Sequence, residues 1–308
     1  MLNISVVIIN YNSSKYTIKC VESILQKTDH SLNYKIYVVD NNSEINDFIS
    51  LNKYFNDNPN PKTVLCRSTI NKGFGGGNMF GYELAEPSEY VAFVNNDTLF
   101  LNDCLSELYQ FIKKNHSVGI VGGQSFNENG KEIISFDHYA STTRQIFGRK
   151  FLELINPKDK PTRKKSYAEP LKVNTVSGSF MLINSNDFNT IGGFDEHLFL
   201  YYEETDVCLR LKKVNKDCFL VPNAHYLHYH GASTQASIAI KKELKISLIY
   251  LVQKHYGWLS KKVLLSYLVT SSFFASILKP SKWSFFTLYL QGAPLSKSLK
   301  NKQKITKI

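Results

Sequence analysis

Cysteine is scarce in this chain of 308 residues, and its cysteines are not spaced for pairing. The five cysteines are an odd number and show no Cys-x-x-Cys spacing, so we expect free thiols in a reducing compartment. Residues 1–10 contain neither a basic leader nor a cleavage site, and we expect a short strand there rather than a signal peptide. Both absences favour a cytoplasmic protein.

Negative charge is almost missing from the C-terminal region. Residues 241–308 contain 13 lysines and one acidic residue, Glu243, so the formal net charge of +11 comes from this region and residues 1–240 are nearly neutral. A basic body would suggest a nucleic-acid partner, which we therefore do not expect. A neutral body with a basic end favours an anionic surface that is met at that end.

A hydrophobic run long enough to span a membrane is also missing. After an amphipathic segment from Lys241 to Tyr256, the stretch from Val263 to Leu278 has no charged residue for 16 positions, which is short of the roughly 20 that a span needs. Its aromatic residues stand among lysines, a pattern that suits a helix lying in a membrane interface. A packed helical cap or a homodimer contact is the alternative.

The chain does contain regularly spaced, buried strands. Apolar runs predict strands at residues 4–9, 36–39, 63–66, 90–94 and 118–121, and capped polar segments predict helices at residues 14–25 and 103–113. This alternation predicts an α/β fold with a doubly wound, mostly parallel sheet. The early strands end in polar side chains, which such sheets direct into a ligand-binding crevice.

The strand at residues 90–94 leads into Asn95, Asn96 and Asp97. A lone carboxylate backed by two amides suits a hard divalent cation that takes further ligands from a diphosphate and water. The alternative is a turn with an Asx cap before a helix that begins near Asn102.

Four glycines stand within residues 71–78, which we expect to form a loop. Such a loop lets the backbone approach a ligand closely and presents N–H groups to phosphate at a helix start. The dinucleotide fingerprint G-x-G-x-x-G belongs after the first strand, whereas this run follows the third. A purely structural turn is the alternative.

Several motifs in order carry a resemblance to a known family. They are SVVIINYN (5–12), VVDNNS (38–43), NKGFGGGN (71–78), VNND (94–97), and downstream residues 176–183, 192–195, 199–206, 228 and 231–233. The set resembles a family 2 glycosyltransferase with the GT-A fold, and more narrowly the rhamnosyltransferase-like branch of bacterial surface polysaccharide synthesis. The resemblance covers roughly residues 5–254.

The resemblance implies a donor site and a metal site. Asp97 and His228 would hold Mg²⁺ or Mn²⁺, which neutralises the leaving diphosphate, and Asp40 would contact the nucleobase. His225 and His230 lie so close to His228 that the register stays open, and a surface histidine cluster is the alternative. The full donor set is Asn10, Tyr11, Asn12, Asp40, Asn71, Gly73, Phe74, Gly76, Asn78, Asn95 and Asn96.

One donor residue departs from the family pattern. The family motif is often Asp-x-Asp, and here its first position is Asn95. The change removes one carboxylate and leaves the grip on the ribose or metal open. A thymidine nucleotide, whose sugar lacks the 2′-hydroxyl, would fit this change.

The resemblance also implies an acceptor site. Inversion by single displacement needs one general base, and Glu204 matches the second residue of the family's acidic pair. Gly178, Asp195 and Glu203 are the expected acceptor-binding residues. The alternative for the acidic cluster is a helix N-terminus favoured by the dipole.

We therefore expect a GT-A domain at residues 1–240, with a nucleotide-binding half at 1–125 and an acceptor-binding half at 170–240. Residues 126–172 would form a mobile lid or a solvated loop, and residues 241–308 a basic helical tail. The expected function is inverting, metal-dependent transfer of L-rhamnose from dTDP-rhamnose to a glycan or polyprenyl-linked acceptor, at the inner face of the membrane, for O-antigen or capsule synthesis. A sugar nucleotidyltransferase and a non-catalytic glycan-binding relative are the alternatives.

Overall fold

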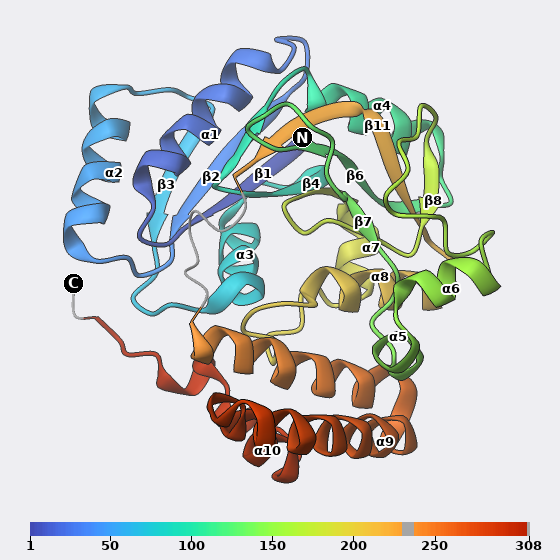
Figure 1. Ribbon diagram of the computed structural model, residues 1–308. Helices are drawn as coiled ribbons and strands as arrows, with labels where there is room; N and C mark the ends of the chain where they lie inside the picture. Colours follow the sequence, from blue (N-terminus) through green and yellow to red (C-terminus); the bar gives the residue numbers. More distant parts are fainter. Residues whose placement is uncertain (230–236, 307–308) are drawn as a thin grey trace.

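A nine-stranded mixed sheet forms the centre of the protein (Figure 1), in a computed structural model that describes residues 1–229 and 237–306. Its strand order is β3-β2-β1-β4-β10-β6-β11-β5, and β8 pairs with β11. The strands are β1 Leu2–Asn10, β2 Tyr34–Asp40, β3 Thr63–Arg67, β4 Ser88–Asn95, β5 Thr98–Phe100, β6 Val118–Phe126, β8 Leu171–Val173, β10 Phe180–Asn184 and β11 Asp217–His228. A separate ribbon pairs β7 Phe136–Asp137 with β9 Thr175–Val176.

The sheet is parallel from β3 to β4 and mixed beyond it. Strands β3, β2, β1 and β4 run parallel, β10 runs antiparallel to both β4 and β6, and β11 runs parallel to β6. The predicted α/β fold with a mostly parallel sheet is confirmed. The strand order reverses at β1, so the ends of β1 and β4 flank the switch point where such sheets bind ligands.

Helices cover both faces of the sheet. The central strands carry apolar residues on both faces, and each face buries them against a layer of helices. In β1, for example, Val6 packs with Ile24 of one helical layer, and Val7 packs with residues of the other. The helices are α1 Ser14–Lys27, α2 Ile45–Asp57, α3 Gly73–Leu84, α4 Cys104–Lys114, α5 Thr142–Phe147, α6 Arg149–Ile155, α7 Ser185–Thr190, α8 Glu203–Lys213, α9 Ile238–Leu278 and α10 Trp283–Leu290.

The predicted glycine loop is wrong in its conformation, because residues 73–78 form the first turns of α3. The glycines let this helix lie very close to the sheet. A Cβ built on Gly77 would stand 2.9 Å from Ile9 Cδ1, and one on Gly81 would stand 2.5 Å from Val7 Cγ1. Among the glycines of α3, only Gly73 has a positive φ (+74°), at the start of the helix. Close packing therefore explains most of the glycine run.

The C-terminal region forms a helical layer against the rest of the protein. Helix α9 breaks at Gly257, whose φ is +82°, and its two halves and α10 lie side by side (Figure 1). Leu248, Leu264 and Leu288 are among the residues buried between them. Within the described residues, α9 is the one helix long and apolar enough to cross a membrane, and 17% of its most apolar 18-residue window is buried.

Candidate active site

A cavity of about 290 Å³ opens at the switch point between β1 and β4. Six of the expected donor residues line it: Tyr11, Asn71, Gly73, Phe74, Asn95 and Asn96. It is also lined by Ile9, Asn41, Val94, Phe199, Leu200 and Ile240, which sequence reasoning did not select as donor residues. Among the described residues, the lining thus combines amides with apolar side chains and contains no charged residue.

The other expected donor residues support the wall of this cavity. Asn10 is fully buried, and its amide donates to Asp40, Ser43 and Asp47 at 2.8–3.1 Å. Asp40 is likewise fully buried and lies 3.2 Å from Arg67 Nε. These contacts tie the ends of β1 and β2 together. Asn12, Gly76 and Asn78 also lie outside the cavity lining, so direct donor contact by these residues stays a prediction.

Asp97 and His228 are brought together by strand pairing. Antiparallel β5 and β11 place His228 opposite Thr98, and His228 Nε2 lies 3.1 Å from Asp97 Oδ1. His225 points elsewhere, with its ring against Phe126 at 5.2 Å between centroids. His230 and residues 231–233 lie outside the described residues. The geometry therefore favours His228 as the histidine partner of Asp97.

Glu204 lies beside the glycine of the predicted acceptor motif. A Cβ built on Gly178 would stand 3.6 Å from the Glu204 Oε2 atom, an ordinary van der Waals distance, so Gly178 lies directly beside this carboxylate. The Thr205 hydroxyl donates to Glu204 Oε1 at 3.2 Å. Burial raises the pKa of Glu204 above its usual range, which brings a carboxylate closer to the operating range of a general base.

Glu203 is buried more deeply than its neighbour. Its side chain is 2% exposed, and its Oε1 atom has no hydrogen-bond partner within the described structure. Burial, and next the charge of Glu204, raise the pKa of Glu203 well above its usual range. Its Cγ atom lies 3.5 Å from a Cβ built on Gly75 of α3, so Glu203 packs between α3 and α8.

The remaining acidic residues of this region fasten α9 to the domain. Asp195 accepts from Tyr250 at 2.7 Å and from Lys254 at 2.6 Å. Fully buried Asp206 pairs with Lys254 and with His255 Nε2, at 2.6 and 2.7 Å. Burial alone would raise the pKa of Asp206, but hydrogen bonds and neighbouring cations hold it below its usual range. Acceptor binding by Asp195 stays a prediction.

A family model supplies the assignment that this geometry suggests. The model described as Glycosyl transferase family 2 matches residues 5–192. The chain belongs to glycosyltransferase family 2. This confirms the resemblance stated from the sequence motifs, and it identifies the protein as a glycosyltransferase.

Relatives of this family 2 glycosyltransferase include rhamnosyltransferases. It is 25% identical over 266 residues to the rhamnosyltransferase WbbL of Escherichia coli (strain K12), covering 81% of this chain and 92% of the relative. It is 36% identical over 88 residues to the N-acetylglucosaminyl-diphospho-decaprenol L-rhamnosyltransferase of Mycobacterium tuberculosis (strain H37Rv), covering 28% of this chain and 29% of that enzyme.

Solved structures confirm the GT-A fold of this family 2 glycosyltransferase. A crystal structure of GalNAc-T7 with UDP, GalNAc and Mn²⁺ has a TM-score of 0.64 at 16% identity, and the match covers 94% of this chain and 56% of that one. The mannosyltransferase PcManGT from Pyrobaculum calidifontis, in complex with GDP-Man and Mn²⁺, has a TM-score of 0.58 at 12% identity, covering 96% and 86%.

The two side chains Asp97 and His228 fit the ligands of a divalent cation. One carboxylate oxygen and one imidazole nitrogen converge within 3.1 Å, and such ions complete their coordination with phosphate oxygens and water. Within residues 1–229 and 237–306, no group of three or more His, Cys, Asp or Glu side chains is placed to hold a metal by itself. The arrangement therefore suits a cation that is shared with a bound diphosphate.

Backbone strain just before Glu203 is a feature that sequence reasoning missed. Tyr201 and Tyr202 both adopt the left-handed conformation, with φ of +76° and +73°, which is costly for aromatic residues and is typical of functional sites. The guanidinium of Arg144, which lies within residues 126–172, is 6.0 Å from the centre of the Tyr202 ring. The sequence FLYYEE at residues 199–204 gave no signal of this conformation, because φ at Tyr201 and Tyr202 depends on the packing around them.

Proposed function

We propose that this glycosyltransferase transfers L-rhamnose from dTDP-rhamnose to a glycan carried on a lipid diphosphate, with inversion at the anomeric carbon. The observation that carries this proposal is the short segment Ser177 to Ser179. The Ser179 carbonyl accepts from the Asn95 N–H at 2.8 Å and from the Thr98 hydroxyl at 3.4 Å, on both sides of Asp97. Gly178, one residue earlier, lies beside Glu204, whose Oε2 atom would be 3.6 Å from a Cβ built on this glycine.

This segment links the two chemical functions that the reaction needs. The donor nucleotide would lie in the amide-lined cavity, with its diphosphate toward Asp97 and His228. The acceptor hydroxyl would lie at Gly178, where Glu204 takes its proton as the oxygen attacks the anomeric carbon. The new glycosidic bond forms as the bond to the diphosphate breaks. A divalent cation bound at Asp97 and His228 would neutralise the charge of the departing diphosphate.

The identity of the donor is supported by Asn95 and by the relatives. An amide in place of the first carboxylate of the family motif removes one charged acceptor from the cavity, and none of the cavity-lining residues that the structure describes is charged. This lining suits a thymidine nucleotide, whose sugar has no 2′-hydroxyl that the site would have to bind. The relatives described above include two rhamnosyltransferases, one of which is named for a diphospho-decaprenol acceptor.

The test is a donor panel with separation of products. The purified protein is incubated with Mg²⁺ or Mn²⁺, a citronellyl-diphosphate-linked N-acetylglucosamine, and thymidine, uridine or guanosine diphosphate sugars. We expect turnover with dTDP-rhamnose and release of dTDP. NMR of the product should show an anomeric configuration inverted relative to that of the donor. Release of pyrophosphate would instead indicate a nucleotidyltransferase, and binding without turnover would indicate a glycan-binding relative.

Asp97→Ala tests the metal site directly. We expect loss of turnover and of the metal-dependent part of dTDP binding, because this carboxylate is the one anionic ligand in the pair. Isothermal titration of dTDP with and without Mn²⁺ measures both. Full activity in a chelator, or an Asp97→Ala enzyme as active as the wild type, would remove the metal from the proposal.

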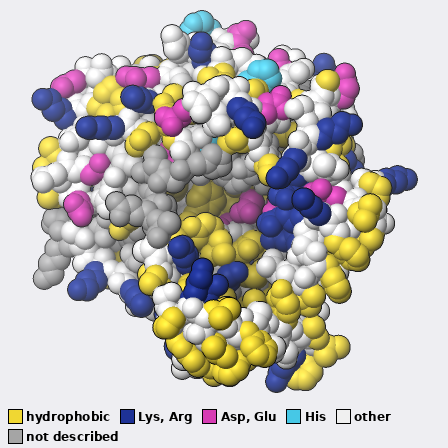
Figure 2. All heavy atoms as spheres, in the orientation of Figure 1, with side chains coloured by type: hydrophobic (Ala, Val, Ile, Leu, Met, Phe, Trp, Pro, Cys, Tyr) yellow, Lys and Arg dark blue, Asp and Glu magenta, His cyan; other side chains and the backbone are white. Residues whose placement is uncertain are grey.

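We further propose that the protein is peripheral at the inner face of the membrane. Apolar side chains are exposed along the second half of α9, with Trp258 at 64%, Leu259 at 68% and Phe274 at 62%. Figure 2 shows hydrophobic side chains gathered over α9 and α10, with lysines beside them. An apolar face with a basic rim suits an anionic leaflet. A homodimer through the same face is the competing outcome.

A further inference from the structure

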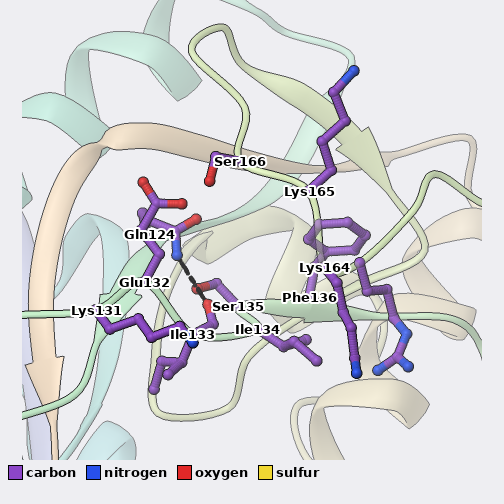
Figure 3. Close-up of a pocket in the computed structure, with 11 residues that line it drawn as sticks. Gln124, Lys131, Glu132, Ile133, Ile134, Ser135, Phe136, Lys164, Lys165 and Ser166 are labelled. Carbon is purple, nitrogen blue, oxygen red and sulfur yellow. Dashed lines mark hydrogen bonds between the residues drawn. The ribbon is translucent and has the colours of Figure 1, made fainter.

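A second, larger cavity lies away from the donor cavity. It has a volume of about 740 Å³ and is built by residues 131–136 and 163–166 with Gln124 (Figure 3). Its lining includes four basic residues, Lys131, Arg163, Lys164 and Lys165, and one acidic residue, Glu132. The donor cavity has no charged residue among the described residues that line it, so the two cavities suit chemically different ligands.

The positive charge of this second cavity is largely uncompensated. Arg163 is anchored, because it lies 3.3 Å from Glu153 and 3.4 Å from Asp137. In the part of the chain that the structure describes, Lys131, Lys164 and Lys165 are exposed and form no salt bridge. Figure 3 shows Lys131 and Lys164 on opposite sides of the opening. Lys165 Nζ lies 5.7 Å from the centre of the Tyr167 ring. Lysines without a carboxylate partner around one opening attract a multiply charged anion.

The cavity also has an apolar side. Ile133, Ile134 and Phe136 line it, and the Ile134 side chain is 40% exposed. Gln124 Nε2 donates to Ser135 Oγ at 3.0 Å, the contact drawn in Figure 3, and so fixes the cavity floor. An anion bound here would therefore be in contact with apolar surface as well as with lysines, which suits an amphipathic molecule.

Two connections join this cavity to the proposed base. The Ser135 carbonyl accepts from the Ser177 N–H at 3.0 Å, and Ser177 precedes Gly178, which lies beside Glu204. On the other side, Asp137 binds both Arg163 and Arg144, and Arg144 lies at the ring of Tyr202. The cavity wall is thus joined through the β7–β9 ribbon to the segment that lies beside Glu204.

We propose that the cavity lined by Lys131, Lys164 and Lys165 binds the diphosphate of the lipid-linked acceptor. This inference rests on the proposed function and names the substrate group that residues 131–136 and 163–166 recognise. The donor diphosphate is assigned to Asp97 and His228, so the acceptor diphosphate needs separate cations. Its lipid end would lie along the apolar side, and its sugar would lie toward Gly178 and Glu204.

The experiment compares two acceptors that differ in the diphosphate. One is citronellyl-diphospho-N-acetylglucosamine, and the other is octyl N-acetylglucosaminide, which has no phosphate. The test variant is Lys164→Glu with Lys165→Glu. The control is Lys53→Glu with Lys62→Glu, which makes the same change in charge outside this cavity. Donor hydrolysis by each variant checks that its fold and donor site are intact.

We expect the test variant to raise KM for the diphosphate acceptor at least tenfold, while its kcat and its KM for the octyl acceptor stay near the wild-type values. The control variant should leave all three unchanged. An equal rise in KM for both acceptors, or no rise for the diphosphate acceptor, would overturn the proposal.

A binding measurement separates this proposal from the proposed function. Inorganic pyrophosphate is titrated into the full chain in EDTA, which prevents metal-dependent binding at Asp97. We expect binding that is at least tenfold weaker in the test variant than in the control variant. If neither acceptor is glycosylated but this difference remains, the proposed reaction fails and the anion site stands. Equal binding by both variants would overturn the anion site, whatever the reaction.

Discussion

At the scale of single residues, two adjacent glutamates have different environments. Glu204 is partly exposed and faces Gly178, where an acceptor would lie, whereas Glu203 is 2% exposed and packs against α3. Burial raises the pKa of both. Only Glu204 is placed to take a proton from a bound acceptor, so exposure separates the proposed base from a packed acid.

Glu204→Gln should lower transfer by about 10² to 10⁴-fold, the usual contribution of a general base, and should leave dTDP binding unchanged. The amide keeps the shape of the side chain but cannot accept the proton. Because the pKa of Glu204 is raised, the acid limb of the wild-type kcat profile should lie above the ordinary glutamate range, and Glu204→Gln should lack it. The same loss in Glu203→Gln with full activity in Glu204→Gln would reverse the assignment.

Glu203 should make stability depend on pH. Its pKa is raised in the folded state, so the folded protein holds this proton more tightly than the unfolded chain does. The stabilising effect of the proton is complete below the ordinary glutamate pKa and is lost as pH rises through the raised value. Glu203→Gln should therefore gain Tm relative to the wild type as pH rises from about 5 to 8. A Tm difference that stays constant over this range would contradict a buried, protonated Glu203.

At the scale of elements, the glycines of α3 determine how near that helix comes to the sheet. The donor cavity is lined by Gly73 and Phe74 on α3 and by Ile9 on β1, so the distance between helix and sheet sets its shape. Asn41 strengthens this arrangement, because its amide donates to the Gly73 carbonyl at 3.0 Å and its carbonyl accepts from the Lys72 N–H at 3.0 Å.

Gly81→Ala should destabilise the protein by roughly 1–3 kcal/mol through overpacking. The new methyl group would stand 2.5 Å from Val7 Cγ1 and 2.9 Å from Val39 Cγ2, both in the sheet. Gly76→Ala is the matched control in the same helix, because its methyl group would meet only Lys72 Cβ, at 3.0 Å. Urea unfolding of both variants measures the difference. Equal stabilities would show that α3 moves away from the sheet without cost.

At the scale of the whole molecule, the tail is both packing surface and exposed surface. Glu243 on α9 accepts from Ser298 at 2.7 Å and from the Leu299 N–H at 2.8 Å, and the Thr306 N–H donates to the Thr69 carbonyl at 2.8 Å. The chain therefore returns from the helical layer to the nucleotide-binding half. Removing residues from Lys261 onward would take away buried Leu264 and Leu288, so point substitutions test membrane binding better than truncation does.

Leu259→Glu with Phe274→Glu should weaken binding to anionic vesicles and leave transfer to the octyl acceptor intact. Both side chains are more than 60% exposed, so the folded protein loses no core contact. Wild-type binding should also weaken as salt rises, because screening shortens the reach of the lysines to about 8 Å at physiological ionic strength. Vesicle sedimentation measures both effects.

The matched control for the tail is Ile45→Glu with Ile49→Glu, on exposed positions of α2 outside the tail. This variant should bind vesicles as the wild type does. If the tail variant binds vesicles normally but changes from dimer to monomer in light scattering, the apolar face is a contact between two copies of the chain.

The sequence by itself determined five strands, at residues 4–9, 36–39, 63–66, 90–94 and 118–121, and the helices near residues 14–25 and 103–113, because these follow from local periodicity and capping. It also determined the order of the polar strand ends. It also determined the family, since the motifs at residues 5–12, 38–43, 71–78 and 94–97 can be recognised as short stretches of sequence. The conformation of residues 73–78 could not be predicted in this way. Glycine is unfavourable in helices, and only the close approach of α3 to Val7 and Ile9 compensates for that cost.

Tertiary structure alone decided which side chains meet. Asp97 and His228 are 131 positions apart, and the pairing of β5 with β11 places His228 rather than His225 beside the carboxylate. Asn10 and Asp40 were expected to contact the donor, and only the tertiary structure shows that both are fully buried and hydrogen-bonded to each other. Their contact with the donor stays a prediction. Local sequence fixes where a strand ends and which residues follow it. The face and neighbour of each side chain depend on strand pairing, which is set by contacts across the whole chain.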